Sequence, residues 1–286
     1  MNKIYLQLRE EARNILAMLP SPKFYKAFEK ERLFSRQMLH SHPLLIRIKQ
    51  EINSIIEDDF GHGMSHSDLV CVDAGAIIQV EMEMEDKSKL PSSLANQTKN
   101  ITIEQSSKVT DNILLVQIAG LLHDIKRKEK QHSIAGAKFT KTFLSTGNYP
   151  LREEEIDIIC CAISEHEAFQ NRDVNKKMTQ KQGRKSRDKE CNQKCLLISN
   201  ALYDADKFRW GPDNFTHTLW DMVIFSNAPI SDFMSRYPYG MQILEEIKST
   251  FRTDTGKVYG PDFIDLGIET GNRLFKIIQQ SNIIAS

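Results

Sequence analysis

The sequence predicts an all-α protein. Nearly every segment with a regular hydrophobic pattern repeats its apolar residues at the 3.6-residue spacing of a helix, and strand-like alternation is scarce. Four prolines, at positions 20, 22, 43 and 150, fall between these segments, where they begin or end helices, and no internal repeat is visible. Because 286 residues can bury a substantial core, we expect one all-α domain over residues 1–286.

The predicted helices follow one another along the chain with short breaks. Pro20 and Pro22 separate the first from the second, Pro43 opens the third, and Pro150 lies just before a later one. The expected ranges are 1–19, 23–39, 43–58, 65–85, 110–127, 132–145, 152–167, 193–208 and 230–250. Residues 211–286 as a whole read as further helices that pack on the core or form an oligomer contact, so a homo-oligomer is left open.

Two polar stretches interrupt the helical pattern. Residues 86–109 are rich in Ser, Asn, Gln and Lys, which favours a solvated loop. Residues 171–194 are markedly basic. They read as a surface insertion, with two other interpretations kept: a flap whose Lys and Arg side chains contact phosphates, or a nucleic-acid contact within 172–194 that would weaken steeply with salt.

The overall composition excludes several classes of function. The 38 basic residues cancel the 38 acidic ones, so no global field recruits nucleic acid or an anionic membrane. No stretch approaches the roughly 20 apolar residues of a membrane span, and the N-terminus lacks the pattern of a signal peptide. The five cysteines are an odd number without framework spacing, which suits a reducing compartment. We therefore expect a cytoplasmic protein with no membrane partner, and a nucleic acid is not the favoured partner, although the contact within 172–194 stays open.

Histidines and aspartates interrupt the apolar faces of several predicted helices. His66 and Asp73 interrupt the face that contains Leu69, Val70 and Ile77, and other helices carry such residues near one end, namely His123 with Asp124, His166 and Asp206. His132 opens a further helix. One such histidine is ordinary, but several helices with the same feature are most simply explained by a shared cation that offsets the burial of imidazoles and carboxylates.

The ligand types restrict the metal. Imidazole nitrogens and carboxylate oxygens without an obvious thiolate suit Mn, Fe, Co, Ni, Zn or Mg, and not a structural zinc cluster. An open site of this mixed type is the catalytic pattern, because a water in a remaining position loses a proton near neutral pH.

The ordered set of motifs resembles the HD-domain metal-dependent phosphohydrolase superfamily. The motifs are "HGMSHS", "AGLLHDI", "HSIAGAKF", "AISEH" and "ALYDADKF", within residues 61–210. The resemblance implies an HD-type helical bundle over that range, with additional helices at 1–60 and a C-terminal extension at 211–286. It also implies one or two divalent metals and the hydrolysis of a phosphate ester or anhydride, with a nucleotide or another small phosphorylated compound as the partner and a metal-bound hydroxide as the nucleophile.

The resemblance assigns roles residue by residue. His66, His123, Asp124 and Asp206 match the shared metal ligands, and Asp204 is the fallback for Asp206. His132 and His166 match the two extra histidines of the two-metal branches, in which the aspartate corresponding to Asp124 bridges the metals and takes part in catalysis. The gap between His66 and His123 is longer than is typical of the family.

Two further residues are candidates for the catalytic site. Arg127 lies one helical turn from His123 and Asp124, where it could hold a phosphate, and His62 lies one turn before His66, where it could contact substrate or support a ligand.

Two rival hypotheses stay open. One is a single-metal enzyme in which His132 and His166 assist substrate binding. The other is a non-catalytic regulatory module that binds metal and a nucleotide or a partner.

Overall fold

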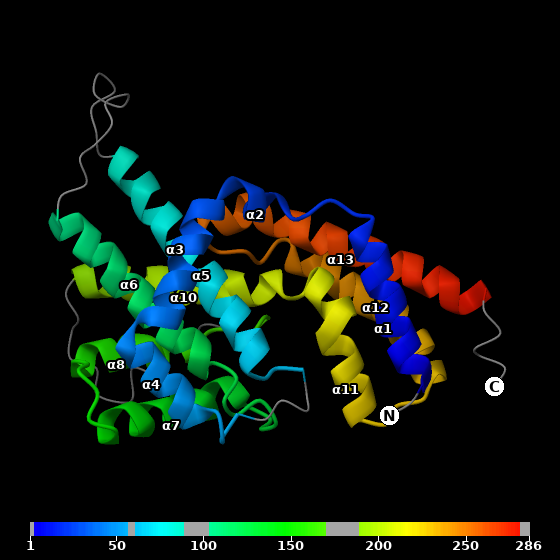
Figure 1. The fold of residues 1–286 in the computed structure, drawn as a ribbon, viewed down its shortest axis with the longest axis horizontal. Helices are drawn as coiled ribbons and strands as arrows, with labels where there is room; N and C mark the ends of the chain where they lie inside the picture. The colour runs from blue at the N-terminus through cyan, green and yellow to red at the C-terminus, as the bar shows by residue number, and fades with distance from the viewer. Residues whose placement is uncertain (1–2, 57–60, 89–102, 170–188, 281–286) are drawn as a thin grey trace.

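The computed structural model describes residues 3–56, 61–88, 103–169 and 189–280, and this part of the chain is helical without a β-strand. The expected all-α class is therefore confirmed for the described residues. The helices are α1 (Lys3–Ala17), α2 (Lys23–Ala27), α3 (Glu29–Ser41), α4 (Pro43–Ile52), α5 (Met64–Ser88), α6 (Ile103–Leu122), α7 (His132–Thr146), α8 (Glu153–Ser164), α10 (Lys189–Phe208), the π-helix η1 (Asn214–Thr218), α11 (Leu219–Phe225), α12 (Ile230–Ile247) and α13 (Asp254–Gln280) (Figure 1).

Several predicted boundaries were wrong. The polar stretch 86–109 is helical at both ends, since α5 continues to Ser88 and α6 begins at Ile103. The basic stretch 171–194 is helical from Lys189 onward, and its residues 171–188 lie outside the described part of the chain. The helix predicted over 23–39 is divided at Phe28, whose φ of −124° and ψ of 41° are not helical. Polar composition was read as loop in the first two cases, although Glu, Gln and Lys are good helix formers on an exposed surface.

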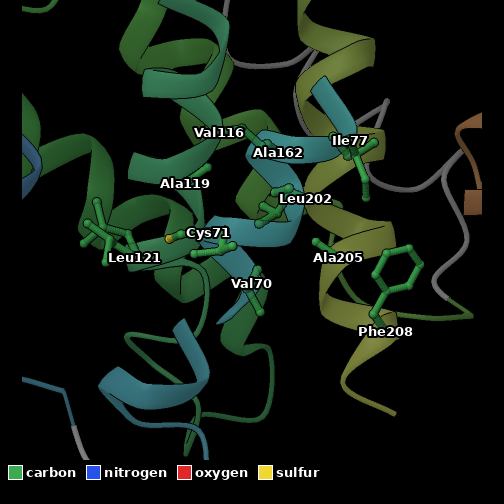
Figure 2. Close-up of a cluster of buried hydrophobic side chains, with 14 of the residues drawn as sticks. Val70, Cys71, Ile77, Val116, Ala119, Leu121, Ala162, Leu202, Ala205 and Phe208 are labelled. Carbon is green, nitrogen blue, oxygen red and sulfur yellow. The ribbon is translucent and has the colours of Figure 1, made fainter. Parts of the chain in front are cut away.

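The centre of the molecule is formed by α5, α6, α8 and α10. Their facing sides carry buried apolar side chains, and Figure 2 shows side chains of α5, α6 and α10 in one cluster that includes Ala162 of α8. α6 is buried almost all round in its second half, since Ile118, Ala119, Leu121 and Leu122 are each 0% exposed. Such packing fixes the ends of these helices relative to one another, which is what a site built from helix ends requires.

Asp73 is held by cations of the protein and does not lie among the other buried histidines and aspartates. Its carboxylate pairs with Arg32, at 2.8 Å from Nε, and with Arg209, and it accepts a hydrogen bond from Tyr25 at 3.3 Å. Arg209 also pairs with Asp213 at 2.5 Å. This buried network ties α2, α3 and α5 to the end of α10, so Asp73 has a structural explanation.

The C-terminal segment packs back on the core through α13. Glycines permit the close approach: a Cβ on Gly267 would lie 2.8 Å from the Cα of Gly211, and one on Gly271 would lie 2.7 Å from the ring of Phe215. α13 also contacts α1, α10 and α12, and Figure 1 shows α1 and α13 at the same end of the molecule. Residues 211–280 contain η1, α11, α12 and α13, and an oligomer contact through this segment stays a prediction. The division of the chain into core and extensions stays a prediction.

Candidate metal centre

The structure brings all six predicted metal ligands into one buried cluster. Each residue lies at or near a helix end: His66 in the first turn of α5, His123 and Asp124 directly after α6, His132 at the start of α7, His166 after α8, and Asp206 in the last turn of α10. The chain leaves α6 in successive tight turns, with Arg127 N donating to Asp124 O at 2.9 Å. The helix predicted over 110–127 therefore ends at Leu122, and the His-Asp pair lies in the turn that follows.

Four of the residues form a first group of donor atoms. The Nε2 atoms of His66 and His123 are 3.3 Å apart. Asp124 Oδ2 lies 3.8 Å from His66 Nε2 and 3.3 Å from His123 Nε2. Asp206 Oδ1 lies 3.4 and 3.7 Å from the same two nitrogens. Both carboxylates thus lie 3.3–3.8 Å from the same two imidazole nitrogens, and Asp206 also groups with His123 and His166.

The remaining two histidines form a second group with the other oxygen of Asp124. His132 Nε2 and His166 Nε2 are 3.3 Å apart. Asp124 Oδ1 lies 3.4 Å from each of them. The carboxylate of Asp124 is therefore shared, with Oδ2 facing the first pair of imidazoles and Oδ1 facing the second.

The hydrogen bonds of the imidazoles show that these atoms suit a cation. Nδ1 of His123 is bonded to Gly120 O at 2.8 Å, Nδ1 of His166 to Ile163 O at 2.6 Å, and Nδ1 of His132 to a carboxylate oxygen at 2.8 Å. These oxygens only accept, so each Nδ1 carries a hydrogen and each neutral ring presents a lone pair at Nε2.

Facing lone pairs need a cation or a proton between them. His132 Nε2 and His166 Nε2 cannot bond each other in this tautomer, and the buried Asp124 Oδ1 beside them has no hydrogen-bond partner. Ligands bound at about 2.1 Å lie about 3.0–3.4 Å apart around an octahedral or tetrahedral metal, close to the separations found here. The buried His and Asp groups could therefore hold a metal ion.

The electrostatics of the cluster also favour positive charge. Burial alone would lower the pKa of His123, but Asp124 and Asp206 outweigh it and raise that pKa to about 10. Burial would likewise raise the pKa of Asp124, yet His123, His166 and Arg127 hold it well below its ordinary value. The pKa of Asp206 is also well below its ordinary value, since Lys207, His123 and His66 outweigh the effect of burial.

The two predicted catalytic residues outside the ligand set also border the cluster. Arg127 Nη1 donates to His132 Nε2 at 2.9 Å and lies 3.8 Å from Asp124 Oδ1. Its side chain is 30% exposed, so the guanidinium connects the cluster to solvent. The ring centroid of His62 lies 5.0 Å from that of His66, and His62 is itself 8% exposed.

Sequence reasoning missed two charged residues that contact the cluster. Glu167 accepts a hydrogen bond from His132 Nδ1 at 2.8 Å. Lys207 is 3% exposed and its ammonium lies 2.5 Å from Asp206 Oδ2. Both directly follow a ligand in the chain, which is the one signal that could have drawn attention to them.

The fallback ligand Asp204 faces away from the cluster. Its carboxylate accepts hydrogen bonds from the backbone N–H groups of Arg252 and Thr253 at 2.9 and 2.8 Å, and from the Thr253 hydroxyl at 2.7 Å. Burial raises the pKa of Asp204 to about 6 despite these donors. Of the two aspartates, Asp206 is the one that lies with the histidines.

Comparisons with known proteins identify no relative of this chain. No protein-family model, curated protein or solved structure matches the chain. In the described part of the chain, no helix has both the length and the apolar character needed to cross a membrane.

Proposed function

We propose that the chain is a metal-dependent phosphohydrolase of the HD-domain type, acting on a nucleotide or another small phosphorylated compound. The observation that carries the proposal is the position of Asp124, whose two carboxylate oxygens each face a different pair of histidines at 3.3–3.8 Å. A carboxylate so placed suits two divalent cations that share it, with Asp206 completing the first group.

When bound, divalent cations of this kind lower the pKa of a water molecule and neutralise charge on phosphoryl oxygens. The protein's part is to present the donor atoms at fixed positions. The carbonyls of Gly120 and Ile163 and the carboxylate of Glu167 orient three of the imidazoles. Lys207 pairs with Oδ2 of Asp206, which leaves Oδ1 toward the histidines.

The surrounding cations support an anionic substrate. Arg127 extends from the cluster toward solvent and presents a planar donor group that suits phosphate oxygens. His62 lies beside the first group, where we assign it a contact with the substrate. With buried donors for cations and a partly exposed guanidinium at one place, a phosphorylated compound is the substrate class that fits best.

The test compares Asp124→Asn with Asp111→Asn. Asp111 is an exposed residue of α6, so its replacement changes the charge of the same segment without reaching the cluster. Metal content after dialysis against Mn²⁺ and phosphate release from a panel of nucleotides and simple phosphate esters would be measured. We expect Asp124→Asn to lose metal and to lower turnover by at least about 100-fold, since ligands of this kind act only together. Full metal content and activity in Asp124→Asn would refute the proposal.

A further inference from the structure

Arg127 forms a hydrogen bond with an atom that the second group of donors needs for binding a cation. His132 Nδ1 donates to Glu167, so the lone pair of His132 is at Nε2, and Arg127 Nη1 donates to that lone pair at 2.9 Å. The same His132 Nε2 faces His166 Nε2 and Asp124 Oδ1 at 3.3 and 3.4 Å. One lone pair cannot accept an N–H hydrogen and bind a cation at the same time.

The charge of Arg127 acts in the same direction. Its Nη1 lies 3.8 Å from Asp124 Oδ1, the buried oxygen without a hydrogen-bond partner. A guanidinium this close to the second group opposes a divalent cation there, because like charges repel strongly at short range in a poorly solvated site. In the first group, Lys207 pairs with Oδ2 of Asp206, whereas the oxygen that lies 3.4 Å from His66 Nε2 is Oδ1.

The side chain of Arg127 can move away from His132 when its charge gains another partner. The side chain is 30% exposed, while Asp124 is 2% and His166 is 2% exposed. Planar pairing with the oxygens of a phosphate is the interaction for which a guanidinium is best suited. A phosphate that enters the site would therefore draw Arg127 from His132 and free the second group.

We propose that Arg127 makes the second cation and the phosphate bind cooperatively. Without phosphate the protein holds one cation, in the group of His66, His123, Asp124 and Asp206, and Arg127 closes the other group. With phosphate bound, the second group takes a cation as well. By linkage, the second cation raises the affinity for phosphate by the same factor. This inference rests on the proposed function, since it takes the cluster to be a metal site for a phosphorylated substrate.

The experiment measures Mn²⁺ binding to the full chain with and without inorganic phosphate. Free Mn²⁺ is followed by electron paramagnetic resonance in equilibrium titrations of the wild type, Arg127→Met and Lys126→Met. Lys126 is the matched control, because it loses one positive charge from the neighbouring position while its ammonium contacts Glu129 and the ring of Phe139. Phosphate concentrations are kept below precipitation of the manganese salt, and circular dichroism verifies that each variant folds.

The wild type should bind about one Mn²⁺ tightly, with phosphate tightening the second by about tenfold or more, within the usual range of coupling between sites. Arg127→Met should bind the second Mn²⁺ about tenfold more tightly than the wild type without phosphate, and phosphate should no longer change it. Lys126→Met should behave as the wild type. Two equal, phosphate-independent sites in the wild type, or no gain in Arg127→Met beyond that in Lys126→Met, would overturn the inference and leave the metal site standing. Absence of Mn²⁺ binding in all three proteins would overturn the proposed function as well.

Discussion

Removal of Glu167 should weaken the second metal position selectively. Its carboxylate accepts from His132 Nδ1 at 2.8 Å, which fixes the tautomer and the direction of the ring and makes Nε2 a better donor. Loss of such a partner typically weakens metal binding by about 10–100-fold. Because Glu167 is 23% exposed, water can replace part of the interaction, and we expect the lower end, about tenfold or 1.4 kcal/mol.

Two substitutions separate orientation from charge. Glu167→Ala removes both the acceptor and the charge, whereas Glu167→Gln keeps an acceptor oxygen for His132 and should lose less affinity. Glu165→Gln is the matched control, since the Glu165 carboxylate accepts hydrogen bonds from Ser199 at 2.8 Å and from the Cys161 thiol at 3.7 Å.

The assay is a Mn²⁺ titration in the presence of inorganic phosphate, in which the first and second binding constants are fitted separately. The second constant should weaken in the order Glu167→Gln, then Glu167→Ala. The first should stay within about twofold of the wild type, because Glu167 pairs with His132, a residue of the second group. If Glu167→Ala bound both ions as tightly as Glu165→Gln, the role assigned to this carboxylate would be refuted.

Three further predictions concern stability. Asp73→Ala leaves the buried Arg209 and the nearby Arg32 without their shared carboxylate, which should lower the free energy of unfolding in urea by about 3–5 kcal/mol; a change below 1 kcal/mol would contradict this reading. Gly256→Ala would place a methyl group onto the Asp204 carboxylate, so we expect a loss of about 1–3 kcal/mol by the same method, and an unchanged midpoint would show that the segment shifts freely. Metal removal with a chelator should lower the melting temperature, since a metal concentration of 100 times Kd stabilises the folded state by about 2.7 kcal/mol. A melting temperature that does not change with chelator would argue against a metal site in the folded state.

The cluster of histidines and aspartates was predictable from the sequence because its signal is local. A buried helix normally carries apolar residues on its inner face, so His66, His166 and Asp206 were visible as exceptions without any knowledge of the fold. The pair at 123–124 was visible for the same reason at the end of the most apolar segment of the chain. What the sequence could not give is the sharing of Asp124 between two pairs of histidines, which depends on how four helices meet.

The residues that were missed depend on contacts far apart in the chain. Glu167 looks like any exposed acid at a helix end, and only the packing of α7 against α8 brings it to His132, 35 positions away in the sequence. Asp73 interrupts an apolar helix face as His66 does, but its partners are Arg32 and Arg209, which come from two other helices. A polar residue on an apolar face thus indicates a buried partner, but the face alone does not say whether that partner is a metal or an arginine.

The fold class was predictable for the same reason as the ligands, and the helix ends were not. Helical periodicity in the apolar residues located the core helices, whereas the ends of α5, α6 and α10 run into polar sequence that carries no such period. α13 was not resolved as a single helix because its glycines and Pro261 resemble breaks in the pattern. In the structure those glycines are where Gly211 and Phe215 approach the helix.

The most direct test of the central claim is whether two cations share Asp124. Electron paramagnetic resonance of the wild type loaded with two equivalents of Mn²⁺ in the presence of phosphate would report it, because two ions joined by one carboxylate are exchange-coupled. We predict the spectrum of a coupled pair in the wild type and in Asp111→Asn, and its loss in Asp124→Asn. Two bound ions with the spectrum of isolated Mn²⁺, or a coupled pair that persists in Asp124→Asn, would contradict the claim.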